Sequence, residues 1–197
     1  MTDQKTKTGK VYIIGAGPGD AGLITLKAVE ALLAVDVVVY DNLVNEELLK
    51  FAPSQAKFIY AGKKGGDHTL SQDRINELLV KEARAGNTVA RLKGGDPFIF
   101  GRGGEEAQIL AENNIEFEII PGVTSAIAVP AYAGIPLTHR GFTSTVAFVT
   151  GHEDPTKEKS DIDWSALAKI GTLVFLMGVK NLPQITKELI KNGKAPE

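Results

Sequence analysis

The stretch Arg91–Glu105, R-L-K-G-G-D-P-F-I-F-G-R-G-G-E, decides the fold of this chain. A β-type run at 87–93 ends abruptly at Gly94-Gly95-Asp96-Pro97, and a helical pattern follows. Paired glycines let the backbone adopt unusual φ/ψ values and approach a ligand closely. Pro97 keeps Asp96 extended, so its carboxylate is held at the tip of the turn. Because ligands of open α/β sheets bind beyond the carboxyl ends of strands, the turn fits a binding loop as well as a purely structural role.

Strand and helix patterns alternate on both sides of this stretch. Strands are expected at 10–14, 36–40, 57–61, 87–93 and 115–120, and helices at 23–34, 71–85, 104–113 and 124–133. Such alternation is typical of βαβ units and a mostly parallel sheet, so the fold class is α/β. The segments that follow the strands carry Gly, Asp, Lys or Thr, which suggests that the carboxyl ends of the strands form a single functional edge of the sheet, called the rim below.

The alternation breaks after residue 135, and this break suggests two α/β domains. We expect a flexible tail at 1–9, an N-terminal domain with the ligand loops at 10–135, a linker at 136–142 and a second domain at 143–197. The second domain contains strand patterns at 144–150 and 172–177 and helical patterns at 164–170 and 182–192. It stops at Ala195-Pro196-Glu197, where extended chain after a helix usually leads into another strand. We therefore expect the second domain to be truncated.

Composition excludes several classes of protein. A net charge of −2 argues against a general nucleic-acid binder, and the absence of cysteine excludes disulfides and thiolate metal sites. The histidines, His68, His139 and His152, are scattered, so no metal site is expected. The polar N-terminus does not resemble a signal peptide, and no apolar run reaches the roughly 20 residues of a membrane span. The sequence thus predicts a cytoplasmic protein.

The glycine-rich segment Gly15-Ala-Gly-Pro-Gly-Asp20 follows the first strand, as a dinucleotide-binding loop would. It departs from G-x-G-x-x-G at Asp20, and Pro18 removes a backbone N–H that phosphate binding would use. Asp20 also places negative charge where a pyrophosphate would lie. These residues disfavour a phosphate ligand and leave open a cationic nucleoside such as S-adenosylmethionine (SAM), or a tight turn in which Asp20 is only a helix cap.

Five segments carry a resemblance to a known family: V-Y-I-I-G-A-G-P-G-D, V-V-V-Y-D-N-L-V, Y-A-G-K-K, V-A-R-L-K-G-G-D-P-F-I-F-G-R-G-G-E-E and I-I-P-G-V-T-S-A. Further segments are I-P-L-T-H-R-G, F-V-T-G-H and V-F-L-M-G. Their order and spacing resemble those of the uroporphyrinogen-III C-methyltransferases, within the tetrapyrrole (class III) SAM-dependent methylases. The resemblance covers nearly the whole chain from Lys10. It implies two α/β domains, usually in a homodimer.

The resemblance also implies an activity and a set of site residues. SAM would methylate two pyrrole carbons of uroporphyrinogen III, giving precorrin-2 for sirohaem and cobalamin synthesis, with S-adenosylhomocysteine as the product of the cofactor. Asp41 would accept a proton and Lys63 would donate one. The implied SAM contacts are Pro18, Gly94, Gly95, Asp96, Ile99, Thr124, Ser125 and Met177.

Each of these residues also has a plainer interpretation. Asp41 is suitable as a cap for a helix at 43–49, Lys63 for gripping a substrate propionate, and Met177 for a core position. Uroporphyrinogen III is a polycarboxylate, so its site needs several cations. The candidates near the rim are Lys63, Lys64, Arg91, Lys93, Arg102 and Arg140. Apart from Lys63, each is interpreted singly as a solvated surface cation.

Three other functions are compatible with parts of the sequence. A sister methylase of the same fold would act on a later corrinoid, on ribosomal RNA or on a protein. An oxidoreductase module would bind NAD, against which Asp20 and the missing third glycine argue. A truncated fragment that folds without turning over is the third alternative.

Overall fold

The structure is a computed structural model that describes residues 8–62, 70–153 and 161–196. Contacts divide the chain into two compact units, Met1–Ser125 and Ala126–Glu197. This division lies earlier in the chain than the linker predicted at 136–142, and that linker stays a prediction. Most of the predicted tail at 1–9 lies outside the described residues.

The first unit is built on a five-stranded sheet in the order β3-β2-β4-β1-β5. Every neighbouring pair in this sheet is parallel, so the predicted α/β class with a mostly parallel sheet is confirmed. The strands are β1 (Lys10–Gly15), β2 (Val37–Tyr40), β3 (Lys57–Tyr60), β4 (Val89–Lys93) and β5 (Glu116–Ile120). All five carboxyl ends therefore lie at one edge, as the sequence pattern indicates.

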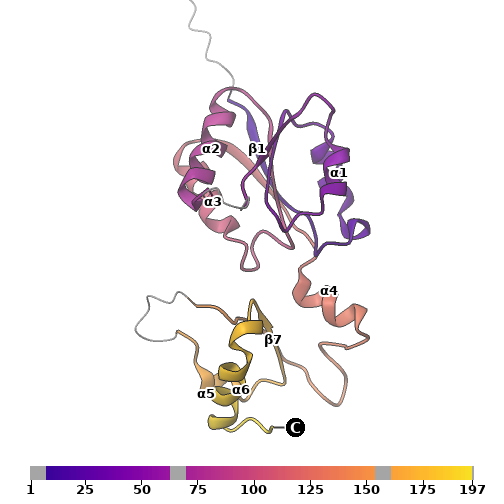
Figure 1. The fold of residues 1–197 in the computed structure, drawn as a ribbon, viewed down its shortest axis with the longest axis vertical. Helices are drawn as coiled ribbons and strands as arrows, with labels where there is room; N and C mark the ends of the chain where they lie inside the picture. The colour runs from indigo at the N-terminus through magenta and orange to yellow at the C-terminus, as the bar shows by residue number, and fades with distance from the viewer. Residues whose placement is uncertain (1–7, 63–69, 154–160, 197) are drawn as a thin grey trace, which may run out of the picture. The chain divides into compact units, whose positions relative to one another are not determined.

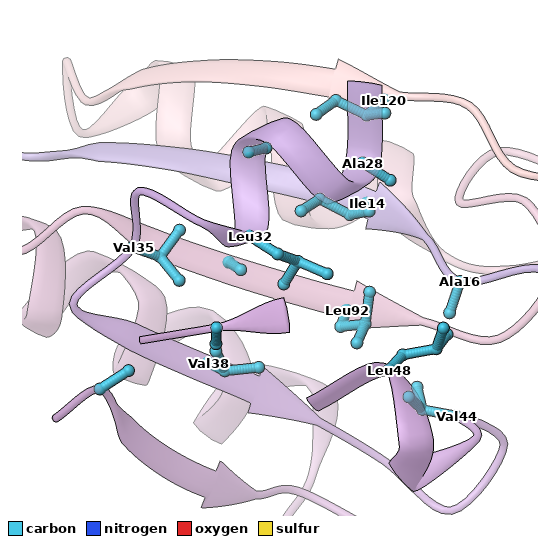
Figure 2. Close-up of a cluster of buried hydrophobic side chains, with 14 residues drawn as sticks. Ile14, Ala16, Ala28, Leu32, Val35, Val38, Val44, Leu48, Leu92 and Ile120 are labelled. Atoms are coloured by element: carbon cyan, nitrogen blue, oxygen red, sulfur yellow. The ribbon is translucent and has the colours of Figure 1, made fainter. Parts of the chain in front are cut away.

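One face of the sheet is covered by α1 (Leu26–Leu32) and the 3-10 helix η2 (Glu46–Phe51). Figure 2 shows the cluster of apolar side chains that fills the space between α1, η2 and the strands. Its fully buried members include Ile14, Leu32 and Leu92. Burial of such a side chain contributes about 1.5–3 kcal/mol to folding, so this cluster is a main source of stability.

The opposite face is covered by α2 (Gln72–Arg84) and α3 (Gly103–Glu112), which lie on the other side of the sheet from α1 in Figure 1. Val37 and Val39 of β2 and Val89 of β4 belong to this second apolar cluster. Successive side chains of a strand alternate between faces. Residues 41, 91 and 93 consequently continue onto the same face as α2 and α3, and two of them are cations.

Local signals place the helix ends. Ser71 caps α2, because its Oγ accepts a hydrogen bond from Arg74 N at 3.3 Å, and Gly86 follows the helix at φ 89°. The helix predicted at 23–34 is wrong in its first turn. Thr25 caps α1 by accepting from Ala28 N at 3.2 Å, and the 3-10 helix η1 (Ala21–Leu23) precedes it. A threonine inside an apolar helical pattern thus starts the helix rather than extending it.

The second unit contains a two-stranded parallel sheet of β6 (Val146–Thr150) and β7 (Thr172–Leu176). Its helices are α5 (Trp164–Leu167), η3 (Val179–Asn181) and α6 (Leu182–Lys191), and α4 (Ser125–Tyr132) begins at the boundary between the units. The helix predicted at 164–170 ends early, at Leu167. Trp164 stacks on Phe175 of β7 with ring centroids 6.2 Å apart, which holds α5 on the sheet. In the described part of the chain, every helix is too short or too polar to cross a bilayer.

An ion-pair network at the edge of the first sheet generates a stability prediction. Glu118 of β5 accepts from Lys10 Nζ at 2.9 Å and pairs with Lys27 Nζ at 2.5 Å. The hydrogen bond from Lys10, followed by that from Lys27, lowers the pKa of Glu118 to about 2. A carboxylate with a depressed pKa stabilises the fold above its unfolded value, and that stabilisation is lost as the pH falls through the folded value. Exposed pairs contribute little, so the effect is small.

We expect Glu118→Gln to lower the urea midpoint slightly at pH 7, and the difference from the wild type to fade between pH 4.5 and pH 2. Urea titrations followed by circular dichroism across this range measure it. Glu116→Gln is the matched control, because Glu116 lies on the same strand but is 74% exposed and 3.3 Å from Lys10. An effect of equal size at pH 7 and pH 2 would contradict the assignment.

Candidate active site

Three loops meet at the carboxyl ends of the neighbouring strands β4, β1 and β5. Gly17 and Gly95 exchange backbone hydrogen bonds, with N···O distances of 3.2 and 2.6 Å. The Asp96 carboxylate links the loop after β4 to the loop after β5, since its Oδ2 accepts a hydrogen bond from Gly122 N at 3.0 Å. The loops after β1, β4 and β5 therefore form one hydrogen-bonded platform.

Glycine is required where these loops touch. A Cβ on Gly122 would lie 2.3 Å from Gly95 O, and a Cβ on Gly15 would lie 2.5 Å from Gly122 Cα. Gly95 differs from both, because it adopts φ +67° and its Cβ position has no neighbour closer than Thr124 Cα at 3.9 Å. Gly95 thus presents bare backbone to open space, as expected where a ligand lies against the chain.

The turn that follows is compact and strained. Asp96 Oδ1 accepts from Phe98 N at 2.8 Å, and Pro97 O accepts from Gly103 N at 2.9 Å. Between them, Phe100 and Arg102 adopt positive φ angles of 50° and 57°. A left-handed conformation costs a non-glycine residue about 1–2 kcal/mol. Such strain gathers at binding sites, where the surrounding structure imposes it.

The structure brings most of the predicted SAM contacts together. Contacts join the segments that contain Pro18, Gly94–Asp96 and Thr124–Ser125 at this platform. Ile99 lies half-buried in the strained turn. Met177 belongs to the second unit, where it directly follows β7, is 58% exposed and adopts φ 58°. It is therefore not a core residue.

A pocket of ≈480 Å³ lies beside this platform in the first unit. Gly94 connects the two, because it lines the pocket and a Cβ placed on it would lie 2.6 Å from Leu43 Cβ. The described residues that line the pocket are Asp41, Asn42, Leu43, Ala61, Gly62, Leu70, Gln72, Ile75, Arg91, Lys93, Gly94, Phe100, Gly101 and Arg102.

Asp41 lies at the edge of this pocket with both carboxylate oxygens engaged. Oδ1 accepts from Leu43 N at 3.0 Å, and Oδ2 accepts from Arg91 Nη2 at 3.0 Å. The side chain is 21% exposed. The cap alternative predicted for Asp41 is wrong in its detail, because η2 begins at Glu46 and is capped by Asn45. Asp41 instead holds the turn after β2 and remains open to the pocket.

The interpretation of Arg91 and Lys93 as solvated cations is wrong. They are 3% and 5% exposed, and both donate to Glu106 Oε1, from Arg91 Nε at 3.1 Å and Lys93 Nζ at 2.8 Å. Burial, and next the nearby Arg91 charge, lower the pKa of Lys93 below its ordinary value. The pocket therefore has buried, mutually fixed charges at its base.

The other predicted cations differ in their environments. Arg102 is exposed and makes a two-pronged pair with Glu105 at 2.8 and 2.7 Å, and Arg140 is exposed in the second unit. Lys63 and Lys64 lie outside the described residues, so the predicted proton donor has no place in the described structure.

Glu106 is the site residue that sequence reasoning missed. It is 0% exposed and anchors Arg91 and Lys93 from α3. A signal was present, because a central strand of a parallel sheet is normally apolar and β4 reads V-A-R-L-K. Two cations at alternate positions of such a strand require a buried anion. The first turns of α3 offer Glu105 and Glu106.

The loop after β1 does not suit a dinucleotide. Asp20 Oδ1 accepts from Gly22 N at 2.8 Å, so a carboxylate takes the backbone donor that a pyrophosphate would use. The predicted cap role of Asp20 is confirmed for η1. The bare backbone at Gly95 leaves room for a ligand to lie against the chain. Within the described ranges, no group of three or more His, Cys, Asp or Glu residues is arranged to hold a metal ion.

The chain is similar to known proteins over nearly its whole length. Residues 10–197 match the family model of the Tetrapyrrole (Corrin/Porphyrin) Methylases. The chain is 58% identical over 190 residues to the S-adenosyl-L-methionine-dependent uroporphyrinogen III methyltransferase of Methanosarcina barkeri, with 96% of this chain and 74% of that protein covered. It is also 58% identical to a uroporphyrinogen-III C-methyltransferase of Bacillus subtilis, with 94% and 72% covered.

A solved structure extends this likeness to three dimensions. The uroporphyrin-III C-methyl transferase of Thermus thermophilus, complexed with S-adenyl homocysteine, superimposes with a TM-score of 0.80 at 45% identity, covering 95% of this chain and 78% of that one. The match to the family model spans nearly the whole chain and includes both units. The chain therefore belongs to the tetrapyrrole methylases.

Proposed function

We propose that this chain is a SAM-dependent C-methyltransferase that converts uroporphyrinogen III to precorrin-2 by two methylations. The names of its relatives in Methanosarcina barkeri and Bacillus subtilis support the substrate. One structural observation carries the proposal. The turn Gly94–Gly95 contacts the pocket beside Asp41 through Gly94 and the platform after β1 and β5 through Gly95. A single turn thus joins a cofactor surface to a substrate pocket.

The residues of the platform suit SAM and its product S-adenosylhomocysteine. The bare backbone of Gly95 lets a nucleoside lie against the chain, and Pro18, Gly94, Asp96, Ile99, Thr124, Ser125 and Met177 are proposed as further contacts. When bound, SAM supplies a sulfonium methyl group that passes to a pyrrole carbon, leaving the neutral thioether and one proton to be removed. The proposed work of the protein is to align the two reactants, and alignment of this kind contributes up to about 7–11 kcal/mol to lowering a barrier.

The pocket is lined by three cations and by the carboxylate of Asp41. Arg102 lies at its exposed side, and Arg91 and Lys93 lie buried at its base. We propose Asp41 as the acceptor of the proton, because it borders the pocket and its Oδ2 is fixed by Arg91. Lys63 is proposed as a proton donor on the resemblance alone. The sulfonium, the carbon nucleophile and Asp41 together balance the reaction, since one C–C bond forms, one C–S bond breaks and one proton leaves.

We further propose that the chain works as a homodimer in the cytoplasm. Exposed apolar side chains of 126–142 support the dimer, namely Ile127, Val129, Tyr132, Ile135 and Phe142. Sedimentation equilibrium is expected to give twice the chain mass of 21.0 kDa. A species of single mass at all concentrations would contradict it. The location rests on the sequence prediction.

The direct test is to incubate the protein with methyl-labelled SAM and enzymatically generated uroporphyrinogen III, and to analyse the product by mass spectrometry. We expect two labelled methyl groups in the tetrapyrrole and release of S-adenosylhomocysteine. The absence of label from the tetrapyrrole, with label on another added substrate, would overturn the proposed substrate.

The platform generates a binding prediction at Gly95. Gly95→Val is expected to weaken SAM binding at least about 100-fold, because a branched side chain at φ +67° is strained and fills the space left for the ligand. Isothermal calorimetry with SAM, S-adenosylhomocysteine and NAD measures it, and NAD is expected to bind weakly or not at all. Gly104→Ala is the control, since a Cβ at Gly104 also meets nothing within 4 Å and lies on α3, away from the platform. Tighter binding of NAD than of SAM would contradict the cofactor assignment.

Asp41 generates a prediction about chemistry. Asp41→Asn preserves the size of the side chain and an acceptor oxygen for one of its two donors, Leu43 N and Arg91 Nη2, but it cannot accept a proton. We therefore expect near-normal folding and SAM affinity, with methyl transfer slower by at least about 100-fold, in line with general-base catalysis. Single-turnover methylation at saturating substrate measures the rate. A loss of only a few-fold would return Asp41 to its role in the turn.

A further inference from the structure

Glu106 has no role in the reaction as described so far, yet it is the most deeply buried charged side chain beneath the pocket. It is 0% exposed, against 3% for Arg91 and 5% for Lys93. Replacing buried ion pairs by apolar residues is often neutral or stabilising. Stability alone therefore does not account for three ionisable groups packed between β4 and α3.

The hydrogen bonds of Glu106 are concentrated on one oxygen. Oε1 accepts from Lys93 Nζ at 2.8 Å, from Arg91 Nε at 3.1 Å and from Gln72 Nε2 at 3.2 Å. Among the described residues, Oε2 is buried without a hydrogen-bond donor. A buried acceptor left in this way costs about 1–3 kcal/mol. The three donors therefore all bind Oε1 instead of being shared between the two oxygens of the carboxylate.

Arg91 links that point to the pocket. Its Nε donates to Glu106, its Nη1 to Leu92 O at 3.1 Å and its Nη2 to Asp41 Oδ2 at 3.0 Å. Each nitrogen of the planar guanidinium thus has a partner in a different direction, which fixes the plane of the group. Asp41 depends on that plane, because Oδ2 has its hydrogen bond from Nη2 and Oδ1 has its own from Leu43 N.

We propose that Glu106 is a positioning residue for methyl transfer, which holds Arg91 in the orientation from which Arg91 fixes the carboxylate of Asp41. The inference rests on the proposed function, and in particular on Asp41 as the proton acceptor. Lys93 and Gln72 share the same Glu106 oxygen and keep Glu106 itself in place. Without the Glu106 charge, Arg91 and Lys93 have only Asp41 as an anionic partner within this group.

A double-mutant cycle between Glu106→Gln and Asp41→Asn tests the inference. Glu106→Gln preserves size and leaves a carbonyl oxygen to accept from Arg91, but it removes the charge that anchors the guanidinium. We expect single-turnover methylation to fall about 10–100-fold, because small misplacements of reacting groups cost this much. SAM affinity is expected to stay within about 3-fold of wild type, since the platform is untouched. In the Asp41→Asn background, Glu106→Gln is expected to add less than about 3-fold, because the group that it positions is already lost.

Glu112→Gln is the matched control. It makes the same substitution on the same helix, and Glu112 is exposed and hydrogen-bonded only to Gln108 in the described structure, at 2.9 Å. We expect its rate within about 2-fold of wild type. If Glu106→Gln does not fold, as judged by circular dichroism, Arg91→Lys decides the matter. It keeps the buried cation but loses the fork, so the same rate loss and the same non-additivity with Asp41→Asn are expected.

Three outcomes would overturn the inference. One is a Glu106→Gln rate within 3-fold of wild type. Another is a loss that multiplies fully with that of Asp41→Asn, which indicates an independent structural effect. The third is a loss of only a few-fold in Asp41→Asn itself. A wild-type chain that methylates nothing would instead overturn the proposed function, so the two failures are distinguishable.

Discussion

The close approach of three backbone segments constrains the rest of the first unit. Gly15 and Gly122 lie where side chains of their own would not fit, since a Cβ on Gly122 would lie 2.3 Å from Gly95 O and a Cβ on Gly15 would lie 2.5 Å from Gly122 Cα. The contact requires β4, β1 and β5 to be neighbours and their carboxyl ends to be level, as the parallel register provides. Packing of α1 and η2 on one face, and of α2 and α3 on the other, keeps the strands in that register. The apolar core therefore keeps the three loops in contact, because a shift of any strand would separate their backbones.

Strand β4 contributes both backbone and charged side chains to the candidate site. Gly94 and Gly95, which directly follow the strand, contribute backbone, whereas Arg91 and Lys93 within the strand contribute buried charges. Burial of charge is tolerated only with paired partners, and here Asp41 supplies one from the turn after β2 and Glu106 supplies the other from α3. The pairing ties three elements together at the base of the pocket. A site built on a rigid strand and helix holds its geometry better than one carried by loops alone.

The sequence predicts the alternation of strands and helices and the positions of the turns at the strand ends well, because these depend on local patterns such as apolar runs, Gly-Gly turns and the Ser71 cap. It fails where the outcome depends on which elements pack together. Thr25 looks like one more helix residue until its hydroxyl is seen to accept from Ala28 N. Arg91 and Lys93 look like surface cations when each is considered alone, because the sequence does not show that α3 covers their side of β4. Glu106 was missed for the same reason, since its neighbour Glu105 has the same charge and only the helix phase separates buried from exposed.

The sheet topology explains why the glycine turn and the buried cations both belong to β4. β1 and β4 are adjacent in the sheet, yet β1 leads into α1 on one face and β4 leads into α3 on the other (Figure 1). Connections that leave neighbouring strands toward opposite faces open a crevice at their carboxyl ends. Gly95 borders that crevice on the β1 side, through Gly17, whereas Gly94 faces the opposite side of β4, toward β2, through Leu43. Because consecutive residues of one turn border the platform and the pocket, the proposed cofactor and substrate sites share one stretch of backbone. In the proposed function, one peptide unit, rather than the packing of separate loops, links the two sites.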